Sequence, residues 1–358
     1  MKQKVLLTGG GSAGHVTPNL ALVPYLQERG IEVAYIGTKN GIEREIVGKT
    51  DLPYYGISAG KLRRYFSFKN FTDPFRILVG YRQAKKILKD LQPDLVFSKG
   101  GFVTVPVTFA ANKLGIPVLL HESDYTPGLA NRLAMPKATK VLVSFESALA
   151  HIEGNKGVLT GSPVRQELFT GSKNRGLEFL GFSGKKPVLL IMGGSLGAAA
   201  INDVVDQTID QLLERFQIVH IRGNGKLNSA LDQKEGYRQF EYVDTQLKDI
   251  FAACDFMLSR AGANAIFELL ALGKPALLIP LPKEQSRGDQ ILNANYFAKK
   301  GFSLVLMQED LNSQTLLSHL DQLVQKRAEL IRNMRSSGMD NGTQNVLNQI
   351  YEILGEGK

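Results

Sequence analysis

The sequence predicts two α/β domains of similar size, each built on a doubly wound, Rossmann-like parallel sheet. Short continuous apolar runs alternate with helical stretches along the chain, a pattern typical of parallel strands that helices cover on both faces. The two halves also begin alike, because each opens with an apolar strand, a glycine-rich turn and an amphipathic helix. A chain of 358 residues exceeds the usual size of one α/β domain, which agrees with two.

The first half opens with the apolar residues 5–8, the glycines 9–11 and a helix expected to run through Leu26. The chain leaves the first sheet near Gly161-Ser162-Pro163, so the first domain is expected to span residues 1–163. Its other strands are expected at four apolar runs, which are Val33–Ile36, Leu95–Phe97, Val118–Leu120 and Val141–Val143.

The second half opens with Val188–Met192, a glycine turn at 193–197 and a helix expected to run through Leu213. The second domain is expected to span residues 164–341. Helical periodicity returns in Thr343–Leu354, so we expect the segment 342–358 to contain a helix that packs back on the first domain. The other strands of this half are expected at Ile218–Ile221, Phe256–Leu258 and Ala276–Ile279.

The net charge of +9 belongs to the first half of the chain. Residues 1–165 contain 22 Lys and Arg against 12 Asp and Glu, whereas the remainder contains 21 against 22. This asymmetry predicts a surface for an anionic partner, such as nucleic acid, anionic lipid or a phosphate-bearing substrate. The single cysteine, Cys254, excludes an intramolecular disulfide, and no apolar run approaches the roughly 18–20 residues that span a bilayer. We therefore expect a cytoplasmic protein.

Glycine-containing turns join predicted strands to predicted helices at several places. Free backbone N–H groups at such turns act with the helix dipole to bind anions. The first turn matches G-x-G-x-x-G at Gly9, Gly11 and Gly14, but no carboxylate ends the second strand, as a nicotinamide enzyme would need. Either turn alone is also compatible with simple packing of a helix on a strand. Two turns in matching positions favour phosphate-bearing substrates.

A further turn, Ser259–Asn264, precedes a helix that carries Glu268. A carboxylate at that position can accept hydrogen bonds from both hydroxyls of a ribose whose phosphate faces the start of the helix. The alternative is an ordinary exposed glutamate on a helix. The spacing alone does not decide between them.

Seven short motifs follow one another along nearly the whole chain. The motifs are Gly10-Gly11-Ser12-Ala13-Gly14-His15-Val16-Thr17-Pro18, Ser98-Lys99-Gly100-Gly101-Phe102, His121-Glu122-Ser123-Asp124, Gly161-Ser162-Pro163-Val164-Arg165, Gly193-Gly194-Ser195-Leu196-Gly197-Ala198, Ser259-Arg260-Ala261-Gly262-Ala263 and Asp289-Gln290-Ile291-Leu292-Asn293. Taken in this order, they resemble the motifs of the MurG transferases of peptidoglycan synthesis. Ser12 and Ala13 replace Thr and Gly of some family members, and Ser123 and Asp124 replace Gln and Asn. An aspartate at position 124 would contact a donor sugar differently from an asparagine amide.

The resemblance implies the GT-B fold, in which two Rossmann-like domains enclose an interdomain cleft. It implies transfer of N-acetylglucosamine from UDP-N-acetylglucosamine to the 4-hydroxyl of undecaprenyl-diphospho-N-acetylmuramoyl-pentapeptide, with inversion at the anomeric carbon. No cofactor is expected, and Asp and Glu do not cluster at the spacing of a metal site. Another lipid glycosyltransferase of the same fold, a UDP-N-acetylglucosamine epimerase and a nucleotide sensor without activity are the alternatives.

Inversion by direct displacement needs a base for the acceptor hydroxyl, and the sequence offers two. His15 opens the first helix beside a glycine turn, and its ordinary pKa of about 6.5 suits proton removal near neutral pH. His15 could instead cap the helix or donate to a phosphate. Glu122 lies at the carboxyl end of a predicted strand, where the clefts of open α/β sheets are found. The choice between them stays open.

The other candidate residues are expected to bind the two substrates. By resemblance, Val243 holds uracil through its backbone, Glu268 the ribose and Gln290 the sugar hydroxyls, and Asp124 faces the donor sugar. The residues expected beside the acceptor diphosphate are Ser12, Ala13 and Gly14. Those expected to hold the diphosphate of UDP are Arg165, Ser195, Gly262 and Ala263.

The segment from Lys61 to Lys89 carries nine basic residues and one acidic residue, with aromatic and aliphatic residues between them. Such a stretch could bind RNA by stacking, lie on an anionic membrane, or form a core helix with a solvated basic face. A lipid-linked acceptor favours the membrane, so we expect peripheral attachment to the anionic cytoplasmic face of the cell membrane and no nucleic-acid partner. The residues expected to form this membrane patch are Arg63, Arg64, Phe66, Phe68, Lys69, Phe71 and Phe75.

Overall fold

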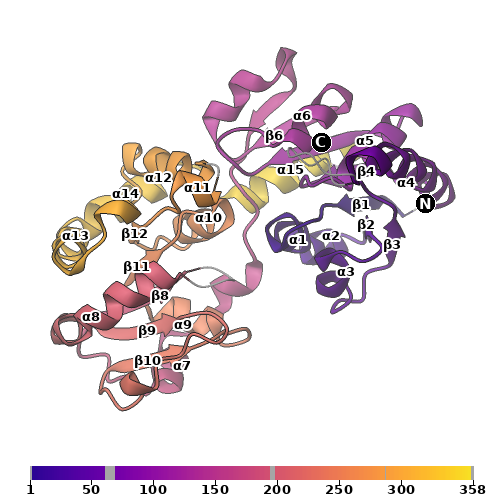
Figure 1. Cartoon of the computed structure of the whole chain (residues 1–358). Helices are drawn as coiled ribbons and strands as arrows, with labels where there is room; N and C mark the ends of the chain where they lie inside the picture. The colour runs from indigo at the N-terminus through magenta and orange to yellow at the C-terminus, as the bar shows by residue number, and fades with distance from the viewer. Residues whose placement is uncertain (1, 61–68, 194–197, 287, 356–358) are drawn as a thin grey trace. The chain divides into compact units, whose positions relative to one another are not determined.

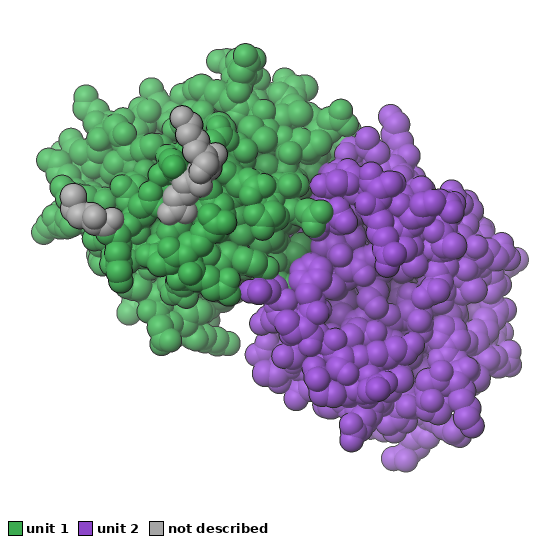
Figure 2. Space-filling view, turned by 180° about the vertical axis from the view of Figure 1, so that it is seen from behind, with its two compact units in different colours: residues 1–165, 341–358 green, residues 166–340 purple. Residues whose placement is uncertain are grey.

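The computed structural model describes residues 2–60, 69–193, 198–286 and 288–355, except for the side chains of 69–74 and Ser286. The chain forms two compact units. The first contains residues 1–165 together with 341–358, and the second contains residues 166–340 (Figure 2). Each unit has its own parallel sheet and its own buried core.

The first unit contains a seven-stranded parallel sheet in the order β3-β2-β1-β4-β5-β6-β7 (Figure 1). The order reverses at β1, which lies between β2 and β4, and ligands of open α/β sheets bind at the carboxyl ends of strands beside such a switch point. The strands are β1 (Lys4–Thr8), β2 (Glu32–Thr38), β3 (Tyr54–Ile57), β4 (Leu95–Ser98), β5 (Val118–Glu122), β6 (Lys140–Val143) and β7 (Gly157–Leu159). The α-helices are α1 (Ala13–Leu20), α2 (Val23–Glu28), α3 (Ile42–Val47), α4 (Lys69–Leu91), α5 (Thr104–Lys113), α6 (Leu129–Ala134) and α15 (Gly342–Leu354).

β1 is buried on both faces. Val5 and Leu7 belong to the core cluster that also contains residues of α15, whereas Leu6 belongs to a second cluster with Ala84 and Leu88 of α4. Successive side chains of a strand point to opposite faces, so one continuous apolar run contributes to both clusters.

The helix expected to run from the first glycine turn through Leu26 is interrupted. α1 ends at Leu20, and α2 begins at Val23 with Pro24 in its first turn. Proline has no N–H to continue the hydrogen-bond ladder of α1, but it is well tolerated at a helix start, so the chain begins a new helix there. The prediction of a single helix is wrong in this respect.

The second unit contains a six-stranded parallel sheet in the order β10-β9-β8-β11-β12-β13 (Figure 1). β8 lies between β9 and β11, so this sheet has a switch point equivalent to that of β1, and the predicted fold class is confirmed. The strands are β8 (Val188–Met192), β9 (Gln217–Ile221), β10 (Tyr237–Phe240), β11 (Phe256–Ser259), β12 (Ala276–Leu278) and β13 (Leu304–Val305). The α-helices are α7 (Lys173–Leu180), α8 (Ala199–Arg215), α9 (Leu247–Ala253), α10 (Ala263–Ala271), α11 (Lys283–Ser286), α12 (Asp289–Lys299), α13 (Ser313–Gln325) and α14 (Arg327–Arg335).

The strands that apolar runs did not predict are the edge strands of the two sheets, β3, β7, β10 and β13. An edge strand has a neighbour on one side only and often carries polar side chains, as the sequence Tyr-Arg-Gln-Phe of β10 illustrates. Continuous apolar runs identify strands that are covered on both faces, so β3, β7 and β10 lack the expected signal, whereas β13 lies in an apolar run, 304–307, that was not predicted as a strand.

Candidate active site

The first glycine turn lies between β1 and α1, and two of its N–H groups bind within the protein. The Gly10 N–H donates to the Gly100 carbonyl (3.3 Å), and the Gly11 N–H donates to the Glu43 carboxylate (3.1 Å). Glu43 also accepts bonds from the Thr38 N–H (2.9 Å) and hydroxyl (2.5 Å). Burial raises the pKa of this carboxyl, but the bonds from Thr38 and Gly11 outweigh burial and lower it. An ionised Glu43 therefore fixes the turn.

The outer part of the same turn is exposed. Ser12 and Ala13 lie on the surface, and Ser12 does not cap α1 with its side chain. The start of an uncapped helix is a place where backbone N–H groups bind phosphate. A second glycine turn lies against the first, because a side chain at Gly101 (φ +90°) would meet the Gly10 carbonyl at 2.2 Å. These two turns form the anion-binding candidate of the first unit.

His15 lies in the first turn of α1 with its ring orientation set by the glycine turn. Its Nδ1 is 2.9 Å from the Gly10 carbonyl and 3.2 Å from Ser12 Oγ. A carbonyl oxygen only accepts, so the neutral ring carries its proton on Nδ1 and leaves the lone pair of Nε2 free. Burial lowers the pKa of His15 below 6.5, although the Gly10 carbonyl and the charge of Asp124 oppose the shift. The ring is therefore neutral near pH 7 and can accept a proton at Nε2.

Glu122 ends β5, and backbone and side-chain donors surround its carboxylate. Oε1 accepts from the Asp124 N–H (2.9 Å), and Oε2 accepts from the Gly128 N–H (3.0 Å) and from Asn131 Nδ2 (2.9 Å). The residue is 4% exposed. A proton on this carboxyl would break at least one of these bonds, so the geometry favours Glu122 as the residue that holds the loop after β5.

A cavity of about 650 Å³ opens beside the first turn, at the carboxyl ends of β2 and β3. Its walls bring together the glycine turn, the loop that carries Lys39, and Arg76 of α4. Two cationic side chains beside an anion-binding turn make this cavity suitable for an acidic ligand.

The candidate residues of the second unit follow the carboxyl ends of its strands. Gly262 precedes α10 in an extended conformation and does not cap it, and Glu268 lies half-buried two turns later. Gln290 is the second residue of α12 and accepts a hydrogen bond from the Leu281 N–H after β12 (3.1 Å), which leaves its amide hydrogens for a ligand. Val243 is buried after β10. The helix start of α10 is thus the anion-binding candidate of this unit.

Arg260 is a residue of this site that the sequence did not single out. It lies directly after β11, is 6% exposed, and donates from Nη1 to the Ile279 carbonyl (3.0 Å). Its buried Nε has no hydrogen-bond partner among the described residues. Burial lowers the pKa of the guanidinium to about 10, so it remains a cation at neutral pH. The sequence signal that could have identified Arg260 is its position inside the motif Ser259–Ala263.

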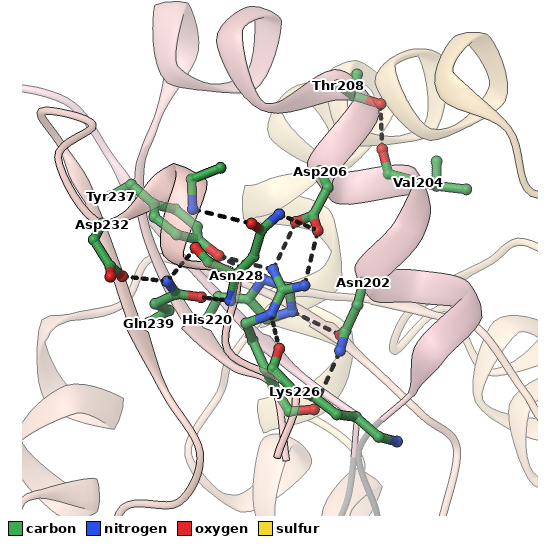
Figure 3. A network of polar contacts seen from close by, with 12 residues as sticks. Asn202, Val204, Asp206, Thr208, His220, Lys226, Asn228, Asp232, Tyr237 and Gln239 are labelled. Carbon is green, nitrogen blue, oxygen red and sulfur yellow. Dashed lines mark hydrogen bonds and ion pairs between the residues drawn. The ribbon is translucent and has the colours of Figure 1, made fainter. Parts of the chain in front are cut away.

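A buried polar network ties α8 to β9 and β10 at the same end of the second sheet (Figure 3). Arg222 donates to both oxygens of Asp206 (2.6 and 2.8 Å) and to the Tyr237 hydroxyl (3.2 Å). His220 lies between the Tyr237 hydroxyl and Asn202 Oδ1, at 3.0 Å from each. Because Asn202 and Asp206 lie in the first turns of α8, the network fixes the start of that helix.

Comparison with known proteins identifies the family to which the chain belongs. The glycosyltransferase family 28 N-terminal domain matches residues 5–143, and the glycosyltransferase family 28 C-terminal domain matches residues 188–350. A UDP-N-acetylglucosamine--N-acetylmuramyl-(pentapeptide) pyrophosphoryl-undecaprenol N-acetylglucosamine transferase of Clostridium botulinum (strain Langeland) is 56% identical over 344 residues, which are 96% of this chain and 97% of the relative. The protein of the same name from Clostridium tetani is 52% identical over 350 residues, 98% of each chain. The chain belongs to the MurG family.

Solved structures agree with this assignment. Acinetobacter baumannii MurG has a TM-score of 0.78 at 27% identity, with 98% of this chain and 99% of that chain covered. A putative UDP-N-acetylglucosamine 2-epimerase from Listeria monocytogenes has a TM-score of 0.69 at 15% identity, with 100% and 98% covered, and shows the fold alone. As a member of the MurG family, the chain is a glycosyltransferase with the GT-B fold.

The site residues expected for a MurG family member fall into two groups. Arg165 is the last residue before the chain enters the second unit, and Ser195 lies outside the described residues. The group at the ends of β1 and β5 is Ser12, Ala13, Gly14, His15, Glu122 and Asp124. The group after β10, β11 and β12 is Val243, Gly262, Ala263, Glu268 and Gln290.

The expected membrane patch is described only in part. Phe75, near the start of α4, is 74% exposed, and Leu78 and Val79 are also exposed. Lys69 and Phe71 lie in α4, but their side chains are outside the described part. Across the described residues, no helix is long and apolar enough to cross a membrane, and no group of three or more metal-ligating side chains could hold an ion. The residues of the patch for which nothing is described are Arg63, Arg64, Phe66 and Phe68.

Proposed function

We propose that this chain transfers N-acetylglucosamine from UDP-N-acetylglucosamine to the 4-hydroxyl of undecaprenyl-diphospho-N-acetylmuramoyl-pentapeptide, a step of peptidoglycan synthesis. The observation that carries the proposal is 56% identity, over 96% of the chain, to a relative whose name states the donor and the lipid-linked acceptor of this transfer. The neutral His15 beside an uncapped helix start supports it, because glycosyl transfer to a hydroxyl needs a base near a site for anions.

The proposed base is His15. Its Nε2 takes the proton of the acceptor hydroxyl while the hydroxyl oxygen attacks the anomeric carbon from the face opposite UDP. The bond between the anomeric carbon and the diphosphate oxygen breaks in the same displacement, which inverts the configuration. The Gly10 carbonyl keeps the ring proton on Nδ1, so that Nε2 faces the reaction in its accepting form.

The proposed donor site consists of residues of the second unit together with Arg165, the last residue of the first unit before the chain enters the second. Backbone groups near Gly262 and Ala263, with Ser195 and Arg165, would hold the diphosphate and offset the charge that develops on UDP as it leaves. Val243 would bind uracil through its backbone, and a half-buried carboxylate at Glu268 can accept from the ribose hydroxyls.

The sugar and acceptor contacts complete the proposed site. Gln290 would donate to the sugar hydroxyls, since its oxygen is already bound to the Leu281 N–H. Asp124 would face the donor sugar from the first unit. Ser12, Ala13 and Gly14 would hold the acceptor diphosphate at the start of α1.

The proposed location is the anionic cytoplasmic face of the cell membrane, to which the chain attaches peripherally. Phe75, Leu78 and Val79 expose apolar area on α4, a helix with basic residues along its length. Apolar area and positive charge on one helix are the two features that hold peripheral proteins on anionic lipid. Nucleic acid is not proposed as a partner, because the acceptor itself is a lipid.

The test is UDP release by the purified protein with UDP-N-acetylglucosamine, in the presence and absence of a short-chain muramoyl-pentapeptide diphosphate lipid. We expect release only with the acceptor, together with a new lipid-linked disaccharide. Release with a different lipid acceptor would identify another glycosyltransferase of the same fold. Conversion of the UDP-sugar without any acceptor would identify an epimerase, and either result would overturn the proposal.

A further inference from the structure

Lys99 is a buried lysine with no carboxylate in direct contact among the described residues. It follows β4 directly and is 1% exposed. Its Nζ lies 2.9 Å from His121 Nδ1, 2.6 Å from Ser123 Oγ and 3.5 Å from Ser162 Oγ. An ammonium group has three hydrogens, so three neutral acceptors match its donors. A lysine is rarely buried without a paired charge, so a functional role is expected for Lys99.

The histidine next to Lys99 is held as an acceptor. His121 Nε2 is 2.9 Å from the Gly161 carbonyl, which cannot donate, so Nε2 carries the ring proton and Nδ1 presents its lone pair to Lys99. Burial and the charge of Lys99 lower the pKa of His121 well below 6.5. Lys99 therefore joins three strand ends, since it follows β4, its partners His121 and Ser123 lie at the end of β5, and Ser162 follows β7.

Lys99 also lies next to the end of β1, which the glycine turn and His15 follow, because β4 pairs with β1 and the Lys99 N–H donates to the Thr8 carbonyl (2.9 Å). Burial lowers the pKa of Lys99 to about 7, while the carboxylates of Glu122 and Asp124 oppose the shift. Lys99 in turn lowers the pKa of His15, whereas Asp124 and Glu43 raise it. The cation and the carboxylates thus act on the same imidazole in opposite directions.

We propose that Lys99 is a positioning residue of the transfer, whose ammonium group holds the segment from His121 to Asp124 and keeps His15 in its proton-accepting form. This inference rests on the proposed function, in which His15 is the base. Below pH 7 Lys99 carries its charge, so it opposes protonation of His15 in the range where His15 would otherwise titrate. Asp124 opposes this effect and stabilises the imidazolium that forms when the acceptor proton arrives.

The experiment compares Lys99→Met, which removes the charge at similar length, with Lys99→Arg, which keeps it. Lys113→Met is the control, because Lys113 is an exposed lysine of the same unit. Three experiments are made on each variant. Thermal unfolding gives the unfolding midpoint, and steady-state kinetics between pH 5 and 9 give kcat and the KM for each substrate. Long-range ¹H–¹⁵N NMR, assigned with His15→Gln, gives the titration of His15.

Lys99→Met is expected to fold, to lose about ten- to a hundredfold in kcat, and to keep the KM of the acceptor within about threefold, because the segment that carries Asp124 is misplaced while the proposed acceptor site at the start of α1 is not. Its His15 titration and the acid limb of its kcat profile are expected at higher pH than in the parent. Lys99→Arg is expected to keep the acid limb, and Lys113→Met is expected to change nothing.

Two results would overturn the inference. One is a folded Lys99→Met protein with unchanged kcat and unchanged His15 titration, and the other is an equal displacement of that titration by Lys99→Arg. If Lys99→Met does not fold, Ser123→Ala removes one acceptor of the ammonium, and an unchanged kcat in that variant overturns the inference as well. The NMR titration needs no turnover, so failure of the proposed function, seen as no acceptor-dependent UDP release by the parent, is separate from failure of this inference.

Discussion

His15 and Glu122 have different hydrogen-bond partners, and this difference indicates different roles for the two side chains. Nδ1 of His15 is bound to a carbonyl and Nε2 has no hydrogen-bond partner among the described residues, whereas three donors surround the carboxylate of Glu122. A base must accept a proton without first losing its structural bonds. We therefore infer that His15 is the base and that Glu122 orders the loop that carries Asp124.

Substitution of each residue by glutamine should separate these roles. His15→Gln is expected to lower kcat about 10²- to 10⁴-fold with an unchanged unfolding midpoint, because it removes the proton acceptor and no buried bond network. The pKa of His15 is lowered, so the parent's kcat should rise with pH below 6.5. That rise should vanish in His15→Gln and persist in Glu122→Gln.

Glu122→Gln is expected to lower the free energy of unfolding by about 1–3 kcal/mol, since an amide NH₂ would face N–H donors that the carboxylate now satisfies. Urea unfolding and the pH dependence of kcat measure both variants. Suppose instead that Glu122→Gln is as stable as the parent and that the rise of kcat with pH is lost in Glu122→Gln but kept in His15→Gln. Glu122 would then be the base, and His15 would have the structural role.

At the scale of the element, α4 is the part of the proposed membrane surface that can be tested directly. Exchange of Phe75 and Leu78 for serine is expected to weaken binding to vesicles of anionic lipid by about tenfold or more, because the exposed apolar area is removed. Co-sedimentation with phosphatidylglycerol vesicles measures this. Phe169→Ser is the control, an exposed phenylalanine of the second unit. Equal binding by parent and double variant would exclude α4 as the attachment site.

The network of α8, β9 and β10 should make the second unit sensitive to acid. Burial and the Arg222 charge lower the pKa of His220 to about 3, whereas an unfolded histidine has a pKa of about 6.5. The unfolded state therefore binds a proton first as the pH falls, and stability present above pH 6.5 is lost between about 6.5 and 3. One such group contributes up to about 1.4 kcal/mol per pH unit. The lowered pKa of Asp206 acts in the same direction at lower pH.

Hydrogen exchange of the β9 amides at pH 7.0 and 5.0 measures this sensitivity. The opening free energy is expected to fall between the two pH values in the parent and to change less in His220→Asn. His319→Asn, which alters a histidine of α13 outside the network, serves as the matched control. Equal pH dependence in parent and His220→Asn would contradict the assignment of a neutral, buried His220.

For the whole molecule, the last helix completes the core of the first unit. Val346, Leu347 and Ile350 of α15 are buried in one cluster with Val5 and Leu7 of β1, although more than 330 positions of sequence lie between them. Unit 1 therefore depends on residues that follow the entire second unit in the chain. Contacts of such long separation form late and are costly in loop entropy.

Ile350→Ala is expected to lower the free energy of unfolding by about 2–5 kcal/mol, because it leaves a cavity in this core. Gln344→Ala, on the exposed face of the same helix, is expected to change it by less than about 0.5 kcal/mol. Urea unfolding of both variants checks this. Equal stability of the two would show that α15 is not an integral part of the first unit.

The local pattern of the sequence was sufficient for the central strands, the first glycine turn and the helix at 343–354. Burial on both faces leaves a continuous apolar run that can be read without a structure, as at Val5–Leu7 and Val188–Met192. The edge strands β3, β7 and β10 lack such runs, whereas the apolar run 304–307 at β13 was not predicted as a strand. The break between α1 and α2 came from a proline, Pro24, whose effect depends on its place in the helix.

The sequence by itself determined the fold class, the family and the two candidate bases, because these depend on residue type, spacing and order along the chain. Only the tertiary structure decided what surrounds each side chain. Glu43 binds the Gly11 N–H from 32 positions away, Glu122 is enclosed by N–H donors, and Lys99 meets Ser162 across 63 positions. Hydrogen-bond partners and burial determine protonation, and both arise from segments that parallel pairing of strands brings together.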